Sequence, residues 1–311
     1  MATGRRLFFE EIRSTLMRAD GGLTEIAEYL ELDPDSPVPK LRFRDDALHD
    51  DVPDEFDIDE AIYKRSQEID EAEYQLSIEE VRLGKRTIVG EGDSWMNLPG
   101  LLGWKAIGDS IKSRKNFSIR NIGKWGDTLK EILQEREYMT ELAEKQPDYF
   151  VFSGGGNDLQ DELAASEDAV IKRFDPALSP SQYLTKDGEE LLAQVASGYH
   201  ALLEEVTQEF PSLKVFTQSY DFPRPLVGKG KWLGRHLAAR DIPPELMSPI
   251  LDDIVLKLDA MIGAAAENYP SVTHVRCLGV TKDFLWRDDF HPKNPGFDAV
   301  AQAIETAINA S

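Results

Sequence analysis

The chain has 311 residues, a formal net charge of −22 and a single cysteine. Its hydrophobic fraction of 41% and charged fraction of 30% are typical of a globular protein in water. No apolar run approaches the roughly 20 residues of a membrane helix, which argues against membrane insertion. The strong acidity repels nucleic acid and anionic lipid, so neither is expected as a partner.

The cysteine usage and the N-terminal residues predict a cytoplasmic protein. Cys277 lies in the strand-like stretch VTHVRCLGV and is interpreted as a small buried hydrophobe. As the only cysteine, it excludes an internal disulfide. After Arg5 and Arg6, only three apolar residues precede Glu10, far fewer than the roughly 7–15 of a signal-peptide core.

Most of the negative charge lies in the first quarter of the chain, where residues 1–80 hold 23 acids against 9 Lys and Arg. Apolar spacing predicts helices over three segments, 6–18, 24–31 and 62–76. Residues 45–60 hold nine acids and no Lys or Arg, which is typical of a solvated loop. We expect residues 1–85 to form an acidic, mainly helical extension that caps a pocket, holds a protein partner or supports a homo-oligomer.

From residue 86 to residue 311 the pattern changes, and strand-like runs alternate with helical ones. Strands are predicted at 86–91, 117–121, 148–153, 213–220 and 272–278. Helices are predicted at 127–145, 189–210, 246–267 and 295–310. This alternation predicts an α/β domain with a parallel five-stranded sheet covered by helices on both faces. Such sheets bind ligands outside the carboxyl ends of their strands.

The tripeptide Gly-Asp-Ser occurs twice, and its two serines have different expected surroundings. Ser94 follows the first strand of the sheet, at the edge where open α/β folds place their chemistry. Ser110 falls inside the following helical segment, where its hydroxyl would point to solvent or bond to its own helix. Position therefore favours Ser94 as a nucleophile, provided that a base accepts its proton.

His291 is the predicted base. It lies between the last strand and the last helix, at the same edge of the sheet, whereas the other four histidines are interpreted as surface or packing residues. Asp288 precedes His291 by three residues, so a tight turn can bring its carboxylate to one ring nitrogen and leave the other for Ser94. Asp289 is the alternative orienting acid, with a less favourable spacing.

Glycine-rich turns after the second and third strands are candidates for the donors of an oxyanion hole. Gly123 and Gly126 come just before a helix start, and Asn157 follows three glycines. Either turn alone is ordinary, and neither a P-loop nor a dinucleotide-binding G-x-G-x-x-G pattern is present. Together with the serine and the histidine, however, they place four kinds of catalytic group on one edge of the sheet.

This combination resembles the SGNH (GDSL) hydrolase family. The matching blocks occur in family order and are Gly92-Asp93-Ser94, Asn121-x-Gly123-x-x-Gly126-Asp127-Thr128, Gly155-Gly156-Asn157-Asp158 and Asp288-x-x-His291-Pro292. The resemblance covers residues 86–311. It implies a flavodoxin-like three-layer α/β/α fold and hydrolysis of a small-molecule ester with no metal and no organic cofactor.

The resemblance also implies roles for single residues. Ser94 would be the nucleophile, His291 the base and Asp288 its orienting carboxylate. The oxyanion donors would be the backbone N–H groups of Ser94 and Gly126 and the side-chain amide of Asn157.

The expected substrate is a short-chain acyl or acetyl ester, on a carbohydrate or a lipid, because no long apolar gate is evident. Trp95, Trp125 and Trp232 are candidates to stack on a sugar or to line an acyl pocket. Arg235 belongs to a basic insertion, residues 221–244, that either balances the acidic extension or recognises an anionic substrate group. Acyl transfer to another acceptor and a catalytically inactive scaffold remain open alternatives.

Overall fold

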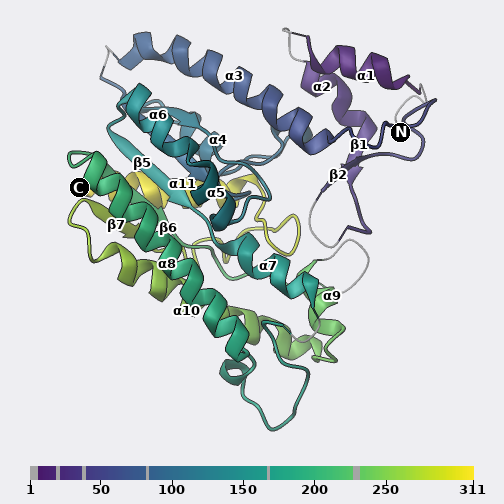
Figure 1. The fold of residues 1–311 in the computed structure, drawn as a ribbon, viewed down its shortest axis with the longest axis vertical. Helices are drawn as coiled ribbons and strands as arrows, with labels where there is room; N and C mark the ends of the chain where they lie inside the picture. The colour runs from purple at the N-terminus through teal and green to yellow at the C-terminus, as the bar shows by residue number, and fades with distance from the viewer. Residues whose placement is uncertain (1–5, 19–21, 37–39, 82–83, 167–168, 227–231) are drawn as a thin grey trace.

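The predicted parallel sheet is present in the computed structural model, which describes residues 6–18, 22–36, 40–81, 84–166, 169–226 and 232–311. Its strands are β3 (Arg86–Gly92), β4 (Phe117–Asn121), β5 (Tyr149–Ser153), β6 (Lys214–Gln218) and β7 (Val272–Val275). They pair in parallel in the order β4-β3-β5-β6-β7 (Figure 1). The order reverses between β3 and β5, so the loops after these two strands flank the crevice where such sheets bind ligands.

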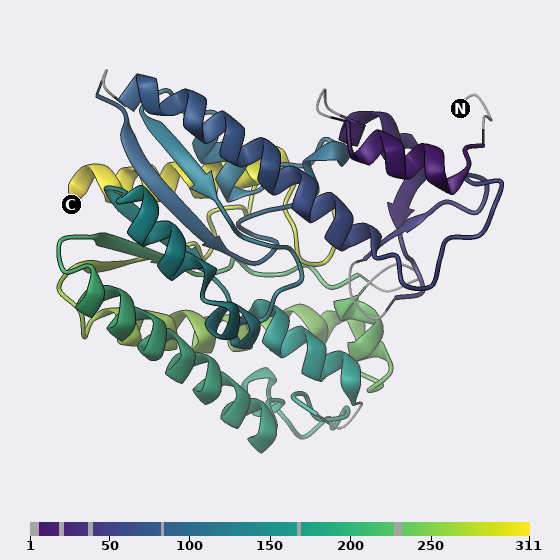
Figure 2. The ribbon, with the colours of Figure 1, turned by 45° about the horizontal axis from the view of Figure 1, so that its top comes forward.

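Helices cover both faces of the sheet, which confirms the three-layer α/β/α fold (Figures 1 and 2). One layer contains α4 (Ile107–Lys112) and α11 (Asn294–Ala310), which pack on each other. The other contains α5 (Leu129–Glu135), α6 (Glu137–Lys145), α7 (Gly156–Ala165), α8 (Lys186–Glu209), α9 (Leu233–Ala238) and α10 (Pro244–Ala266). Among the described residues, no helix combines the length and the apolar character needed to cross a bilayer.

The segment predicted as one helix over 127–145 is two helices. Arg136, between α5 and α6, has a left-handed backbone with φ of 55°, which ends the first helix. Its guanidinium pairs with Glu205 of α8, so the residue between the two helices also contacts a segment that is distant in the sequence. Helical periodicity does not show this break because apolar spacing continues through it.

The interior strands explain why the sheet edge is well defined. Ile88, Val89, Phe150, Val151 and Val215 are completely buried, as expected for parallel strands covered on both faces. Because these side chains fill the core, the polar residues that follow each strand are left at the carboxyl edge of the sheet. Cys277 is also fully buried, as predicted.

The N-terminal extension is less helical than predicted. It contains α1 (Phe9–Leu16), α2 (Gly22–Ile26), a 3-10 turn (Ala27–Tyr29), β1 (Leu30–Leu32), β2 (Leu41–Phe43) and α3 (Ile58–Val81). The predicted helix over 24–31 is therefore wrong in its second half, where β1 pairs with β2 in an antiparallel ribbon. Strands of three residues are too short to give an alternating pattern in the sequence.

Helix α3 lies along the edge strand β4 (Figure 2). The Tyr63 hydroxyl donates to the carbonyl of Ile122 at 3.0 Å, and the Gln67 amide donates to the carbonyl of Asn121 at 3.1 Å. Arg120 of β4 pairs with Glu71 of α3 at 3.1 Å. The helix therefore shields one exposed edge of the sheet from other strands.

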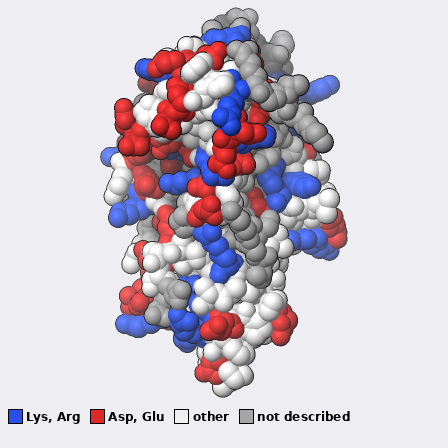
Figure 3. Space-filling view, turned by 90° about the vertical axis from the view of Figure 1, so that its right-hand side faces the viewer, with Lys and Arg blue, Asp and Glu red and all other residues white. Residues whose placement is uncertain are grey.

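Acidic and basic side chains are interspersed over the extension, at the top of Figure 3. Several carboxylates are paired within it, including Glu31 with Arg42 at 2.6 Å and Asp46 with Arg44 at 3.3 Å. The extension's small core, built from Ile12, Ile26, Leu30, Leu41 and Ile62, also contacts Leu101, Leu102 and Trp125 of the sheet domain. The domain boundary at residue 85 stays a prediction.

Candidate active site

The turn after β3 places Ser94 at the carboxyl edge of the sheet. Gly92 has φ of 152°, and a Cβ there would lie 2.1 Å from the carbonyl oxygen of Ser153, so β3 and β5 approach this closely only with glycine. Asp93 is buried and accepts a hydrogen bond from the backbone N–H of Trp95 at 2.9 Å. These contacts close the turn with Ser94 facing a cavity.

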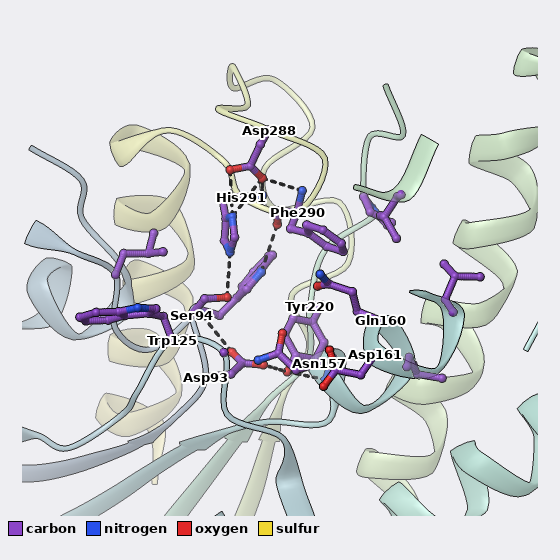
Figure 4. A pocket seen from close by; sticks show the side chains of 18 of the residues that line it. Asp93, Ser94, Trp125, Asn157, Gln160, Asp161, Tyr220, Asp288, Phe290 and His291 are labelled. Carbon is purple, nitrogen blue, oxygen red and sulfur yellow. Dashed lines mark hydrogen bonds and ion pairs between the residues drawn. The ribbon is translucent and has the colours of Figure 1, made fainter. Parts of the chain in front are cut away.

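Ser94, His291 and Asp288 form a continuous hydrogen-bonded chain (Figure 4). The Ser94 Oγ atom lies 2.7 Å from His291 Nε2. On the other side of the ring, His291 Nδ1 lies 2.9 Å and 3.0 Å from the two carboxylate oxygens of Asp288. Ser94 comes almost two hundred positions before the loop that carries Asp288 and His291. The arrangement of the three side chains is that of a serine hydrolase triad.

Asp288, and not Asp289, faces the histidine. The Asp288 Oδ1 atom also accepts the backbone N–H groups of Phe290 and His291, both at 2.8 Å, which fixes the turn. The Asp289 carboxylate points the other way and accepts the backbone N–H groups of Leu226, Trp232 and Leu233. The ambiguity that the sequence left is thus resolved in the geometry, with Asp289 in a structural position.

Burial and charge act in opposite directions on the carboxyl groups of the site. Burial raises the pKa of Asp288, but the facing charge and hydrogen bonds of His291 outweigh it and hold that pKa below its ordinary value. Burial raises the pKa of Asp93 to about 6, although hydrogen bonds from the Tyr220 hydroxyl and the Trp95 N–H lower it. Asp288 is therefore ionised throughout the neutral range.

The predicted oxyanion donors line the same cavity as Ser94. Gly126 has φ of 91°, a left-handed conformation that favours glycine in the turn before α5. The Asn157 amide donates one N–H to the carbonyl of Asp127 at 2.8 Å, which orients the side chain and leaves a second N–H for another acceptor. Tyr220 links the turn after β3 to the start of α7, because its hydroxyl donates to Asp93 and accepts the Gly156 N–H.

The second Gly-Asp-Ser has no access to this site. Ser110 is completely buried in α4, and its hydroxyl has no hydrogen-bond partner among the described residues. Both expected alternatives, a hydroxyl that faces solvent and one that bonds to its own helix, are therefore wrong. Asp109 accepts the backbone N–H of Ala106 at the start of α4. A Cβ at Gly108 would lie 2.2 Å from the Asn121 side chain, so this glycine serves close packing.

The cavity beside Ser94 has a volume of about 390 Å³, within the range of small-molecule sites. The polar part of its lining includes Lys40, Asp57 and Asp59 from the extension, which also contributes Leu32 and Leu41. Trp125 lies beside this part. Another part is apolar and comprises Leu163, Val170, Ile171, Leu233, Leu251, Ile254, Val255 and Leu258. An acetyl group alone would leave most of this space empty, and the apolar residues are too scattered in the sequence to have been grouped from it.

Two of the four predicted substrate-binding residues line the cavity. Trp125 does so while its indole N–H donates to Asp59 at 3.0 Å. Trp95 lines it too but is mostly core, with 3% of its surface exposed and its ring packed edge-on against Tyr220 and Phe297.

Trp232 and Arg235 are not among the described residues that line the cavity, so the structure does not place them at it. Trp232 is buried beside Asp289, and the Arg235 guanidinium donates to the carbonyl of Ser36 at 2.7 Å. Arg235 therefore joins the basic insertion to the extension through a hydrogen bond to an uncharged carbonyl. Residues 227–231 of that insertion lie outside the described part of the chain.

Sequence reasoning missed the contribution of the extension to the site. Asp59 belongs to the acidic segment 45–60, which was predicted to be a solvated loop, yet it accepts the Trp125 indole N–H and the backbone N–H of Leu41. It also missed Gln160, which lines the cavity from α7. The spacing of Asn157, Gln160 and Leu163 at three-residue intervals was the available signal, since such residues share a helix face. The described residues contain no group of His, Cys, Asp or Glu suited to a metal ion.

The comparisons with known proteins give likenesses of structure only. No family model matches the sequence, and no curated protein matches it. Among solved structures, the chain is similar to a protein described as a GDSL-like lipase from Parabacteroides merdae, with 16% identity, coverage of 73% of this chain and 98% of that one, and a TM-score of 0.44. It is also similar to an acetyl xylan esterase from Geobacillus stearothermophilus, with 14% identity, coverage of 72% of this chain and 95% of that one, and a TM-score of 0.41.

A third likeness, to an extracellular lipase from Streptomyces rimosus, has 11% identity, coverage of 70% of this chain and 99% of that one, and a TM-score of 0.46. The structural neighbours are thus GDSL-like lipases and esterases, the class that the sequence blocks resemble. Each TM-score is below 0.5 and each identity is below 20%, so the activities in these names are not transferred to this chain.

Proposed function

We propose that this protein is a serine esterase that hydrolyses a carboxylic ester through an acyl-enzyme intermediate. The observation that carries the proposal is the hydrogen-bonded chain from Ser94 Oγ through His291 to Asp288 at the wall of a cavity. The likeness to esterases is consistent with it.

In the first step, Ser94 Oγ attacks the ester carbonyl and its proton passes to His291 Nε2. Asp288 holds the ring with Nδ1 protonated and stabilises the imidazolium that forms. The oxygen that becomes negative accepts hydrogen bonds from the backbone N–H groups of Ser94 and Gly126 and from the Asn157 amide. The imidazolium then protonates the leaving alcohol, and the carbon–oxygen bond of the ester breaks.

In the second step, His291 takes a proton from water, and the resulting hydroxide attacks the acyl-Ser94 carbonyl. The tetrahedral intermediate collapses, His291 returns the proton to Ser94 Oγ, and the carboxylic acid leaves. The polar part of the cavity suits the alcohol and the apolar part suits the acyl group, since each then meets side chains of its own character.

A fluorophosphonate probe tests the nucleophile directly. We expect wild type and Ser110→Ala to be labelled at equal rates and Ser94→Ala not to be labelled. Ser110 is a matched control because it belongs to the second copy of Gly-Asp-Ser and is fully buried. Labelling of Ser94→Ala, or no labelling of wild type, would contradict the proposal.

Product analysis separates hydrolysis from acyl transfer. With and without an added acceptor alcohol, we expect the free acid as the main product. A new ester in the presence of the acceptor would instead identify a transferase that uses the same site. A cytoplasmic location is likewise proposed, on the single buried Cys277, and cell fractionation tests it.

A further inference from the structure

Gln160 is a buried polar side chain at the cavity, and its amide nitrogen has no hydrogen-bond partner in the part of the chain that the structure describes. It is 5% exposed and lines the cavity from α7. Figure 4 shows its amide end pointing into the space beside Phe290 and Tyr220, on the opposite side of Ser94 from Trp125. Buried polar side chains are nearly always hydrogen-bonded in folded proteins, so an unpaired amide at a ligand cavity indicates a ligand group that completes it.

The position of Gln160 along α7 says which part of a substrate would meet it. Asn157, Gln160 and Leu163 line the cavity at successive three-residue steps of one helix face. Each step advances about 4.5 Å along the helix axis. Moving away from the proposed oxyanion hole, α7 therefore presents an oxyanion donor, then an unpaired amide, and then an apolar side chain.

The surroundings of Gln160 assign it to the acyl half of the substrate. Beyond it the cavity is lined by apolar side chains of α7, α9 and α10, and lining side chains continue onto the green helices at the right of Figure 4. The extension contributes the charged side chains of Lys40, Asp57 and Asp59 near Trp125, and Asp161 and Asp221 are further acids in the lining. An amide at the start of an apolar compartment selects a chain that is apolar except at one position.

We propose that Gln160 recognises an oxygen substituent on the acyl chain, so that the preferred substrate is an ester of a hydroxy acid with its hydroxyl on the third or fourth carbon. A step of about 4.5 Å corresponds to three or four bonds of an extended chain, since three backbone bonds span about 3.5 Å. The amide can accept the hydroxyl proton through Oε1 and donate to the hydroxyl oxygen through Nε2. This inference rests on the proposed esterase function and narrows its substrate.

The test compares ethyl 3-hydroxyhexanoate with ethyl hexanoate, in wild type and in Gln160→Leu, by the rate of acid release. We expect wild type to have a kcat/KM at least about tenfold higher for the hydroxy ester, because a site built for a hydroxyl rejects the analogue that lacks it. Gln160→Leu has a side chain of similar size without the amide. It is expected to lose this preference, so that the two esters have a similar kcat/KM.

The fluorophosphonate labelling rate shows whether each variant keeps a working site, and Gln160→Met is a second apolar variant. If wild type and the two variants are labelled but wild type does not prefer the hydroxy ester, the inference about Gln160 is overturned and the esterase function stands. The same holds if each variant loses activity to the same extent on the two esters. If wild type is not labelled at all, the proposed function fails and this inference fails with it.

Discussion

The two regions that meet at the cavity are held in place by different interactions. In residues 86–311 the loops that carry the proposed catalytic residues follow strands of the sheet, and β3, β5 and β6 bury most of their side chains, so apolar packing fixes where the loops after these three strands begin. The extension joins this domain through polar contacts, such as Tyr63 with the carbonyl of Ile122 and Arg120 with Glu71, as well as through the packing of its small core on Leu101, Leu102 and Trp125. We therefore propose different roles for the two regions: the sheet positions the reacting groups, and the extension shapes the cavity around the substrate.

The largest effect is expected within the sheet domain, where Asp288 and Asp289 are neighbours with different partners. Asp288→Asn should lower kcat about 10⁴-fold, because an amide no longer holds the productive histidine tautomer. Steady-state kinetics of the purified variant measures this loss.

Asp289→Asn is the matched control. It weakens three backbone hydrogen bonds around Trp232 and should lower stability while kcat changes little. If kcat were lost in Asp289→Asn and kept in Asp288→Asn, the assignment of the orienting acid would be wrong; urea unfolding measures the stability of both variants.

The next effect concerns Asn157, the proposed oxyanion donor on α7. Asn157→Ala removes the side-chain amide and should lower kcat about 10²–10³-fold with a smaller change in KM, because the lost hydrogen bond forms mainly in the transition state. Asp161→Ala, on the same helix and also lining the cavity, is the control and should retain most of the activity. Equal losses in kcat for the two variants would argue against an oxyanion role for Asn157.

The sequence predicted the sheet and the meeting of Ser94, Asp288 and His291, because both depend on local pattern and on position along the chain. Each strand was a short apolar run, and Ser94, Asn157 and His291 each followed a strand. The rest depended on contacts between distant segments. Nothing near Asp59 in the sequence indicates Trp125 as its partner, and nothing near Trp232 shows that the core covers it.

Asp93 provides a test of the cost of a buried acid at the sheet edge. Its pKa is about 6 in the folded protein, whereas its ordinary value is 3.8. Between about pH 4 and pH 6 the unfolded chain therefore loses this proton while the folded chain keeps it, so stability falls as the pH rises. Relative to Asp93→Asn, the free energy of unfolding of wild type should decrease by about 3 kcal/mol over this range. Urea unfolding at several pH values measures it, and parallel curves for the two proteins would contradict the shift.

The smallest effect concerns a contact between the two regions. A residue of the extension touches the loop that carries Gly126. Asp59 accepts the indole N–H of Trp125, the residue before Gly126. Asp59→Ala should lower kcat about tenfold, since the loop that carries the Gly126 N–H loses a hydrogen bond to a charged group. Asp54→Ala, an exposed acid of the same segment, is the control and should behave as wild type.

A double-mutant cycle decides how Asp59 acts. If it works only by holding Trp125, then Asp59→Ala combined with Trp125→Phe should lose no more activity than either single change, because each removes the same hydrogen bond. If Asp59 contacts the alcohol of the substrate, the losses should add, and KM should change between esters that differ only in their alcohol. In the first case the extension contributes to the chemistry through the oxyanion loop, and in the second it contributes only to substrate selection, as the comparison of the two regions predicts.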